Sequence, residues 1–148
     1  MSIVLRELEW SQIYSIWRKN LWPNRTTPIE THSAMLYKGG HDMENFRFKV
    51  DFLGCFKDNK LVGVNSGHKT MDGGYRSRGL WVHPDHRGQG IGQILLRQII
   101  EYRSNSFFVW SYPRMTSWNT YKAVGFQLTS DWQASDTSEA NAYCILHR

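Results

Sequence analysis

The stretch that decides the fold runs from Val82 to Gly92 and reads VHPDHRGQGIG. Its composition indicates the end of a strand, a glycine-rich turn and the start of a helix. The segment Ile91–Tyr102 follows directly and places its apolar residues on one helical face. Backbone amides at a helix start point outward unpaired, and the helix dipole makes that end positive. Because glycines let a ligand approach the backbone, the stretch predicts an anion site, most naturally for a phosphate or pyrophosphate.

Other phosphate-binding turns do not fit this stretch. A dinucleotide-binding turn has the spacing Gly-x-Gly-x-x-Gly after the first strand and an acidic residue further on. The glycines here, at positions 88, 90 and 92, lie in mid-chain and lack that spacing. A nucleoside-triphosphate loop ends in Gly-Lys-Ser or Gly-Lys-Thr, which the chain does not contain. On these residues alone, a plain connection between a strand and a helix stays open.

Length and composition bound the class of protein. The 148 residues are 41% hydrophobic and 14% aromatic, which fits one globular domain over residues 1–148. No run is long and apolar enough to span a membrane, and the first residues lack a signal-peptide pattern, so we expect a cytoplasmic protein. Cys55 and Cys144 lie in expected strands and are interpreted as buried, inert thiols. No residue spacing indicates a zinc site, and we expect no metal.

The charge balance favours anionic partners only weakly. The formal net charge is +5, but the basic residues are dispersed and form no polybasic run. Binding of nucleic acid is therefore not indicated and is kept only as a third hypothesis. A polyanionic cofactor would explain part of the positive excess.

Periodicity along the chain predicts a strand, two helices, three antiparallel strands, and then helix, strand, helix and closing strands. A capping box and a proline at Thr27–Glu30 predict the start of the second helix. The expected helices are Glu7–Asn20, Thr27–Tyr37, Ile91–Tyr102 and Ser117–Val124; the expected strands after the first are Phe52–Phe56, Lys60–Lys69, Tyr75–Val82, Phe107–Tyr112, Gln127–Trp132 and Asn141–Leu146.

Three motifs in order resemble the GNAT superfamily of acyl-CoA-dependent N-acyltransferases. They are Leu80–Pro84 (a fourth strand with its Val-x-Pro exit), Arg87-x-x-Gly90-x-Gly92 (the acyl-CoA turn) and Tyr121–Phe126 (a Tyr-x-x-x-Gly-Phe element). The resemblance implies an α/β (α+β) fold in a single domain. Its mixed, mostly antiparallel central sheet would be flanked by helices and splayed between strands four and five.

The resemblance also implies acetyl-CoA as co-substrate and assigns residue roles. Turn amides would hold the CoA pyrophosphate, and the fourth strand would run beside the pantetheine arm. A bulge near Gly79 would aim a backbone amide at the thioester carbonyl. Tyr121 would be the catalytic acid that protonates the departing thiolate, although packing on the core is its structural alternative. The implied cofactor-binding residues are Leu80, Trp81, Val82, Arg87, Gly88, Gln89, Gly90, Ile91, Gly92 and Tyr121.

Two positions depart from the family pattern. An asparagine that often contacts the cofactor is replaced in the segment Pro113–Met115, where Arg114 would contact a CoA phosphate or a substrate anion. The segment Tyr75–Gly79 carries no carboxylate to act as general base. Deprotonation of the acceptor is therefore left open between water and the side chains of His68, Asp72, Glu30 and His32.

The acceptor side is less specified. Arg76 and Arg78 share one strand face; they are either exposed charges or, if that face lines the acceptor cleft, favour a carboxylate-bearing acceptor such as an amino acid or acidic peptide. Trp17, Trp22 and Tyr37 belong either to the core or to an aromatic acceptor wall.

Two functions compete at this point. The first is an N-acetyltransferase that moves the acetyl group of acetyl-CoA to a primary amine of a small molecule or peptide by direct attack. The second, motivated by the missing strand carboxylate, is a catalytically silent acyl-CoA-binding sensor or interaction module. A membrane partner is not expected, and a homodimer is left open.

Overall fold

A computed structural model describes residues 2–134 and 139–147. Its centre is a seven-stranded sheet with the order β1-β2-β3-β4-β5-β7-β6, in which β4 and β5 are parallel and all other neighbours antiparallel. This mixed, mostly antiparallel sheet confirms the predicted fold class. The strands are β1 Ile3–Glu7, β2 Val50–Lys57, β3 Lys60–Lys69, β4 Gly74–Val82, β5 Phe108–Ser111, β6 Gln127–Leu128 and β7 Cys144–His147.

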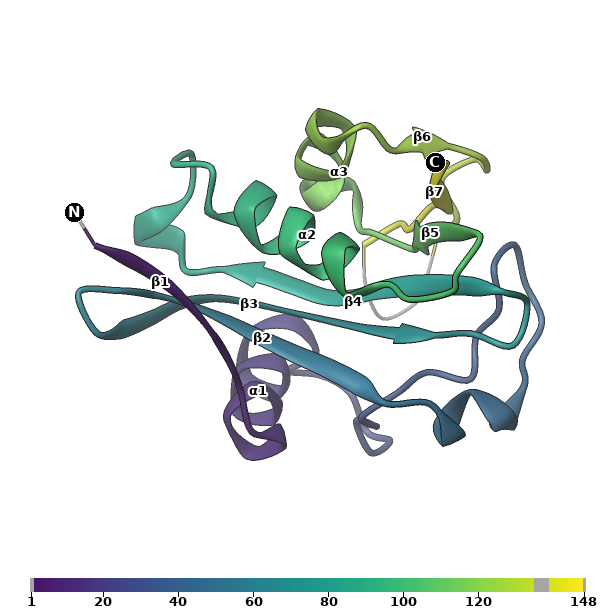
Figure 1. Ribbon diagram of the computed structural model, residues 1–148, viewed down its shortest axis with the longest axis horizontal. Helices are drawn as coiled ribbons and strands as arrows, with labels where there is room; N and C mark the ends of the chain where they lie inside the picture. The colour runs from purple at the N-terminus through teal and green to yellow at the C-terminus, as the bar shows by residue number, and fades with distance from the viewer. Residues whose placement is uncertain (1, 135–138, 148) are drawn as a thin grey trace.

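Helices cover both faces of the sheet (Figure 1). The helices α2 (Ile91–Tyr102) and α3 (Trp118–Val124) lie on one face, and α1 (Trp10–Ile16) lies on the other. Leu95 and Ile99 of α2 are fully buried in an apolar cluster against the sheet. A second cluster gathers around side chains of α1 and its continuation on the opposite face. The short helices are η1 Trp17–Leu21, η2 Met43–Arg47, η3 Pro84–His86 and η4 Met115–Ser117.

The strand β4 pairs with β5 over only part of its length. Their parallel register runs from Gly74 opposite Phe108 to Arg76 opposite Trp110, whereas β4 continues to Val82. The two strands therefore part after Arg76. This opening is the splay between strands four and five that the resemblance implies.

A bulge bends the free half of β4. The register with β3 shifts between the pairs Val64–Trp81 and Ser66–Arg78, and Gly79 within it has a φ of +78°, which glycine adopts without strain. The indole nitrogen of Trp17 donates to the carbonyl oxygen of Gly79 over 2.8 Å. The bulge expected near Gly79 is therefore present, and Trp17 holds it in place.

The first predicted helix is present, but its limits differ. The chain is helical from Trp10 to Ile16 and then widens into the π-helix η1, which ends at Leu21. Glu7 belongs to β1 instead, because its backbone pairs with Leu53 of β2.

The predicted second helix, Thr27–Tyr37, is wrong: no helix forms there. Side chains distant in sequence satisfy the backbone of this segment instead. The carboxylate of Asp72 accepts from the amide of Tyr37 over 2.8 Å, and Nε2 of His68 accepts from the amide of Ser33 over 3.2 Å. Tertiary contacts have overridden the local capping signal.

Asn45 fastens this irregular segment to the turn after β3. Its buried amide nitrogen donates to the carbonyl oxygens of Ser33 and Met35 over 2.9 and 3.0 Å. Its carbonyl oxygen accepts from the amide of Met71, beyond the end of β3, over 2.8 Å. One side chain therefore joins the segment around Ser33 and Met35 to the turn that follows β3.

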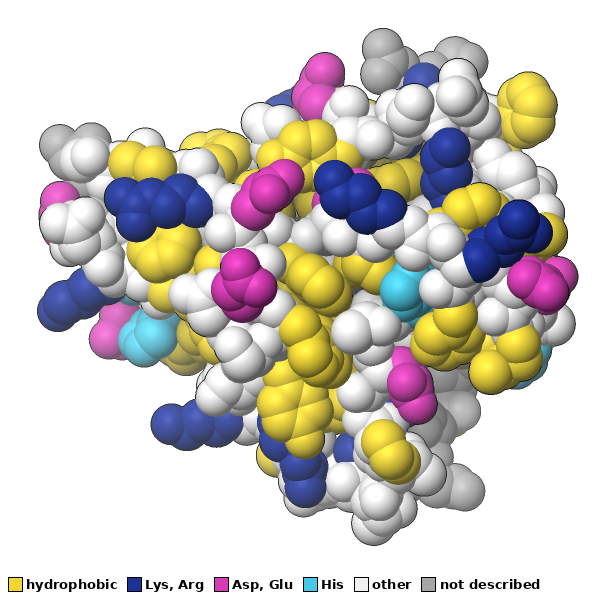
Figure 2. Space-filling view, turned by 60° about the horizontal axis from the view of Figure 1, so that its bottom comes forward, with side chains coloured by type: hydrophobic (Ala, Val, Ile, Leu, Met, Phe, Trp, Pro, Cys, Tyr) yellow, Lys and Arg dark blue, Asp and Glu magenta, His cyan; other side chains and the backbone are white. Residues whose placement is uncertain are grey.

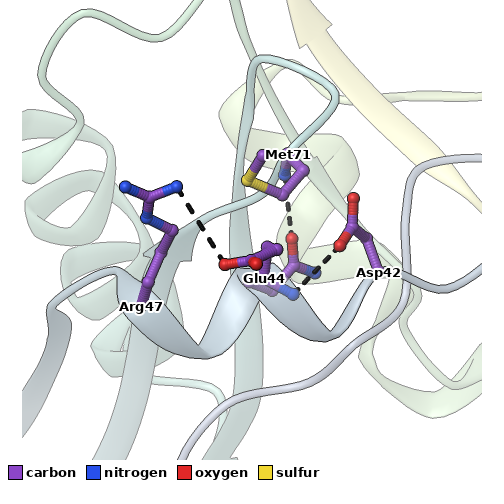
Figure 3. Close-up of polar contacts among 5 residues, drawn as sticks. Asp42, Glu44, Arg47 and Met71 are labelled. Atoms are coloured by element: carbon purple, nitrogen blue, oxygen red, sulfur yellow. Dashed lines mark hydrogen bonds and ion pairs between the residues drawn. The ribbon is translucent and has the colours of Figure 1, made fainter.

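The short helix η2 presents Asn45 to these partners. The carboxylate of Asp42 accepts from the amide of Glu44 over 2.9 Å and caps the helix (Figure 3). Glu44 and Arg47 also approach to 4.0 Å, but both are largely exposed, so this ion pair adds little stability.

The positive charge is not gathered on the face shown in Figure 2. There the Lys and Arg side chains lie apart from one another, among acidic, apolar and uncharged groups. Within residues 2–134 and 139–147, no helix combines the length and the apolar character that crossing a bilayer requires.

We predict that Gly79→Ala destabilises the protein by about 3 kcal/mol, because a left-handed backbone and a steric clash add up. A Cβ at Gly79 would lie 2.3 Å from the ring of Trp17. Gly40→Ala is the matched control, since Gly40 has a φ of +85° but its Cβ would meet nothing nearer than 3.9 Å; it should cost about 1 kcal/mol. Urea denaturation measures both, and equal losses would contradict the role given to Trp17.

We also predict that Asn45→Ala loosens the segment 24–48. Its removal leaves buried carbonyl groups without a donor, which costs about 2–3 kcal/mol. Hydrogen exchange followed by mass spectrometry should show faster exchange in residues 24–48 and around Met71. Unchanged exchange there, or an equal increase in α2, would argue against the fastening role of Asn45.

Candidate functional site

A cavity of about 570 Å³ opens in front of the glycine-rich turn. We call it the turn cavity. It lies between the end of β4, the start of α2 and the start of α3, so the predicted turn and the predicted fourth strand meet in it. Among the residues lining it are Leu80, Trp81, Val82, Arg87, Gly88, Gly90, Ile91, Gly92, Ser117 and Thr120.

The backbone of the glycine-rich turn is accessible from the turn cavity. Gly88 and Gly90 have φ values of +77° and +83°, and a Cβ on either would meet nothing within 4 Å. Gly90 is the N-cap of α2, and no side chain caps its first amides. These amides and the positive end of a twelve-residue helix thus face the turn cavity.

The side chains of Arg87 and Gln89 make hydrogen bonds that hold the turn. The Nε of Arg87 donates to the carbonyl oxygen of Val82 over 2.9 Å and so closes the turn between β4 and α2. The Oε1 of Gln89 accepts from Nζ of Lys57 over 3.0 Å. Arg87 lines the turn cavity, whereas Gln89 does not.

A second cavity of about 670 Å³ lies where β4 and β5 part. We call it the gap cavity. Residues of both strands line it, together with the irregular segment fastened by Asn45. The two cavities share the lining residues Leu21, Leu80, Arg114 and Ser117. A molecule in one cavity can therefore meet a molecule in the other beside the bulge of β4.

Tyr121 lines the gap cavity close to this junction. Its hydroxyl oxygen lies 2.9 Å from Oγ of Ser77 on β4 and 3.2 Å from Oγ of Ser111 on β5. The hydroxyl of Ser111 also lies 2.7 Å from the carbonyl oxygen of Ser77, which can only accept a proton. Burial raises the pKa of Tyr121 to about 12, so its hydroxyl is protonated near neutral pH.

The four candidate bases fall into two pairs. His68 and Asp72 line neither cavity. Nδ1 of His68 donates to the carbonyl oxygen of Lys69, and Asp72 accepts from Thr70 in the turn after β3. These side chains hold the fold together and do not reach the junction.

Glu30 and His32 do line the gap cavity. Both ring nitrogens of His32 already have partners, since Nε2 lies against the carbonyl oxygen of Phe48 and Nδ1 lies 2.8 Å from Oγ1 of Thr31. Glu30 supplies the one carboxylate among the described residues that line this cavity.

The residues considered for the acceptor site lie partly in the core and partly at the gap cavity. Arg76, Arg78 and Trp22 line the gap cavity, whereas Tyr37 does not and Trp17 is fully buried behind Gly79. The aromatic wall considered for the early helices is thus reduced to one indole.

Arg114 lines both cavities. Its guanidinium donates to the carbonyl oxygen of Leu21, at the end of η1. Because a guanidinium carries five N–H donors in a planar fork, Arg114 is suited to hold an anion from either side of the junction.

Neither cysteine belongs to the site. Cys55 and Cys144 are buried and unpaired, and neither lines a cavity. Burial raises the pKa of both thiols, to about 12 for Cys144, which disfavours the nucleophilic thiolate. In residues 2–134 and 139–147, no group of three His, Cys, Asp or Glu side chains is placed to hold a metal ion.

The sequence did not reveal several residues at the junction. Ser77 and Ser111 flank the Tyr121 hydroxyl, yet they are ordinary strand serines in the sequence, 34 residues apart. Leu21 and Ser117 complete the passage between the cavities. Only the parting of β4 and β5 brings these side chains together, so no local pattern could have indicated them.

Comparison with known proteins gives one family and many similar folds. The sequence model of the "Acetyltransferase (GNAT) family" matches residues 9–126. No curated protein matches the sequence significantly. Among solved structures, the ribosomal-protein-S18-alanine N-acetyltransferase of Escherichia coli is 15% identical, with a TM-score of 0.65 over 99% of this chain and 94% of that one.

Two further structures contain coenzyme A groups. Naa50 of Arabidopsis thaliana, in complex with the bisubstrate analogue CoA-Ac-MVNAL, is 20% identical, with a TM-score of 0.65 over 98% of this chain and 97% of that one. A protein of Bacillus anthracis in complex with acetyl coenzyme A is 14% identical, with a TM-score of 0.66 over 100% and 99% of the two chains. At these identities the structures show a shared fold.

The mixed sheet, splayed between β4 and β5, is the fold that these structures share with the chain. The family match covers most of the chain, so the protein belongs to the GNAT acetyltransferase family. The predicted family and enzyme class are thereby confirmed.

The burial of His68 predicts that the stability of the protein depends on pH. Burial lowers the pKa of His68 from 6.5 to about 3. Between these values the unfolded chain binds a proton that the folded protein does not, so the free energy of unfolding falls as the pH is lowered. The expected loss from pH 7 to pH 5 is about 2 kcal/mol from this group.

Urea denaturation of the protein and of His68→Gln at both pH values checks this expectation. His68→Gln should lose about 2 kcal/mol less than the wild type over the same change of pH. His41→Gln is the control because His41 is exposed, and it should behave like the wild type. Parallel losses in wild type and His68→Gln would show that another group carries the pH dependence.

Proposed function

We propose that the protein is an N-acetyltransferase that moves the acetyl group of acetyl-CoA to a primary amine by direct attack. The single observation that carries this proposal is the meeting of two cavities beside the bulge of β4. One cavity ends at open helix amides, and the other ends at a protonated tyrosine. Such an arrangement suits a donor and an acceptor that enter from separate sides and react where they meet.

The turn cavity would bind the CoA donor. The amides at Gly88, Gly90 and the first turn of α2 offer hydrogen bonds to the pyrophosphate, where the helix dipole favours negative charge. Gln89 would take part through its backbone, since its side chain is bonded to Lys57. Acetyl coenzyme A in the similar structure from Bacillus anthracis supports this choice of donor.

The free half of β4 would guide the pantetheine arm toward the junction. Leu80, Trp81 and Val82 line the turn cavity, beyond the last pair of β4 with β5. A backbone amide of the bulge would donate to the thioester carbonyl as negative charge develops on its oxygen. The rigid indole behind Gly79 keeps this donor in place during the reaction.

Tyr121 would serve as the general acid. The amine nitrogen attacks the thioester carbon, the bond from carbon to sulfur breaks, and the departing thiolate takes the hydroxyl proton of Tyr121. The acetylated nitrogen releases its own proton to solvent or to a base. Glu30 is one candidate for that base because it lines the gap cavity. No covalent intermediate is required, and the buried thiols of Cys55 and Cys144 take no part.

The amine acceptor is proposed to be a small molecule or a peptide end. The bisubstrate analogue bound by the similar Arabidopsis protein joins coenzyme A to a peptide, which supports an amine at the junction without identifying it. We place the reaction in the cytoplasm, which suits a chain whose two cysteines are free thiols.

The test is consumption of acetyl-CoA, followed as released thiol, with a polyamine, an aminoglycoside, an amino acid and a peptide with a free amino end. Turnover with at least one amine is expected. Tight binding of CoA by calorimetry without turnover of any amine would instead favour a catalytically silent acyl-CoA-binding module.

We predict that Tyr121→Phe lowers kcat by about a hundredfold on the best amine while the KM for acetyl-CoA changes little. Tyr75→Phe is the matched control, because the Tyr75 hydroxyl donates to Asp51 over 2.6 Å and lines neither cavity. It should reduce stability and leave kcat near the wild-type value. Full kcat in Tyr121→Phe would remove the tyrosine from the mechanism.

A further inference from the structure

Arg76 and Arg78 are unusually deep in the protein for arginines. They lie two residues apart on one face of β4 and are 7% and 6% exposed. Both line the gap cavity. Arginines are rarely buried to this extent unless an anion pairs with them, because removing a charge from water is costly. Their position therefore calls for a negative partner.

Among the described residues, no carboxylate lies within ion-pair distance of Arg78. Its Nη1 donates to the backbone carbonyl oxygen of Glu30 over 2.8 Å. Its guanidinium lies 5.0 Å from the ring centre of Trp17 and 5.2 Å from that of Trp22. These contacts shape the site around the cation, but they do not neutralise its charge.

The guanidinium of Arg76 has even fewer polar partners than that of Arg78. Its Nη1 lies 3.6 Å from the sulfur of Met35, a weak acceptor, and its guanidinium lies 5.0 Å from the ring centre of Trp110. Its Nε is buried and has no hydrogen-bond partner among the described residues. No carboxylate in the described part of the chain lies within ion-pair distance of Arg76 or Arg78.

The rest of the cavity adds to the positive charge. Arg25 and Arg114 also line it, and Glu30 is the one acidic residue among the described residues that line it. Burial, and then the charge of Arg76, lowers the pKa of Arg78 to about 9, so both guanidinium groups are charged near neutral pH. An anion between them would relieve the desolvation and the mutual repulsion together.

We propose that the amine acceptor carries a carboxylate and that Arg76 and Arg78 bind this carboxylate in the gap cavity. Carboxylate oxygens match the planar fork of a guanidinium and can accept several of its unused donors. Arg76, Arg78 and Tyr121 line the same cavity, so an acceptor whose carboxylate the arginines hold lies in the cavity that also reaches Tyr121 and the junction. The inference rests on the proposed function, and it identifies the acceptor as an amino acid or an acidic peptide.

The carboxylate site is tested first without turnover. Succinate at 10 mM should raise the melting temperature of the protein by about 2–4 °C, whereas the uncharged succinamide should not. The rise should disappear in Arg76→Gln and Arg78→Gln and persist in Arg47→Gln, which changes an exposed arginine outside both cavities. No difference between succinate and succinamide would overturn the proposal.

The same variants distinguish a binding role from a structural one. Without ligand, Arg76→Gln and Arg78→Gln should melt no lower than the wild type, because each removes an unpaired buried charge. A lower melting temperature in both would assign the arginines to the fold and contradict the proposal. If either variant fails to fold, Arg76→Lys and Arg78→Lys, which keep the charge, should retain part of the succinate effect.

The acceptor is then tested with matched pairs, such as leucine with leucinamide and β-alanine with β-alaninamide. We expect kcat/KM to favour the carboxylate by at least tenfold, and this ratio should approach one in Arg78→Gln. Equal rates or a preference for the carboxamide would overturn the inference and leave the acetyltransferase intact. If no amine of either kind consumes acetyl-CoA, the proposed function fails, and the succinate experiment still decides the carboxylate site.

Discussion

The parting of β4 from β5 after Arg76 is the constraint on which the rest of the site depends. Parallel pairing stops there, yet β4 runs on to Val82 with its other edge still paired to β3. A half-free strand of this kind needs support, and the indole of Trp17 provides it by packing on the bulge at Gly79. Because β4 and β5 stay apart, the turn cavity and the gap cavity both reach the backbone of β4 beside its bulge.

Keeping this gap open has an energetic cost that the two apolar clusters offset. The fully buried residues of α2 on one face, and Ile13 with Trp17 on the other, anchor β4 from both sides. Between them the site retains groups that a purely structural core would exclude: two buried guanidinium groups and the hydroxyl of Tyr121. Unfavourable burial concentrated beside one cavity is characteristic of a binding or catalytic site.

The parts of the fold that sequence patterns predicted are those whose signals are local. The turn before α2 and the apolar face of Ile91–Tyr102 depend on neighbouring residues. The bulge near Gly79 was instead implied by the family resemblance, and Trp17 supports it from far along the chain. The helix expected at Thr27–Tyr37 failed because its capping box competed with contacts from elsewhere, above all the three hydrogen bonds of Asn45. A buried asparagine has no periodicity, so its decisive role could not be read from spacing.

The difference between local and long-range signals also explains why the sequence indicates the donor but not the acceptor. The turn cavity is built largely from one continuous stretch, from Leu80 to Gln93, so a motif can record its chemistry. The gap cavity takes its wall from the irregular segment after Leu21, from β4, and from residues beyond β5, and no short motif spans these. Its chemistry must instead be inferred from the charges that folding brings together. Two buried arginines have no ion-pair partner in the described part of the chain. They are therefore more informative about the acceptor than any motif in the chain.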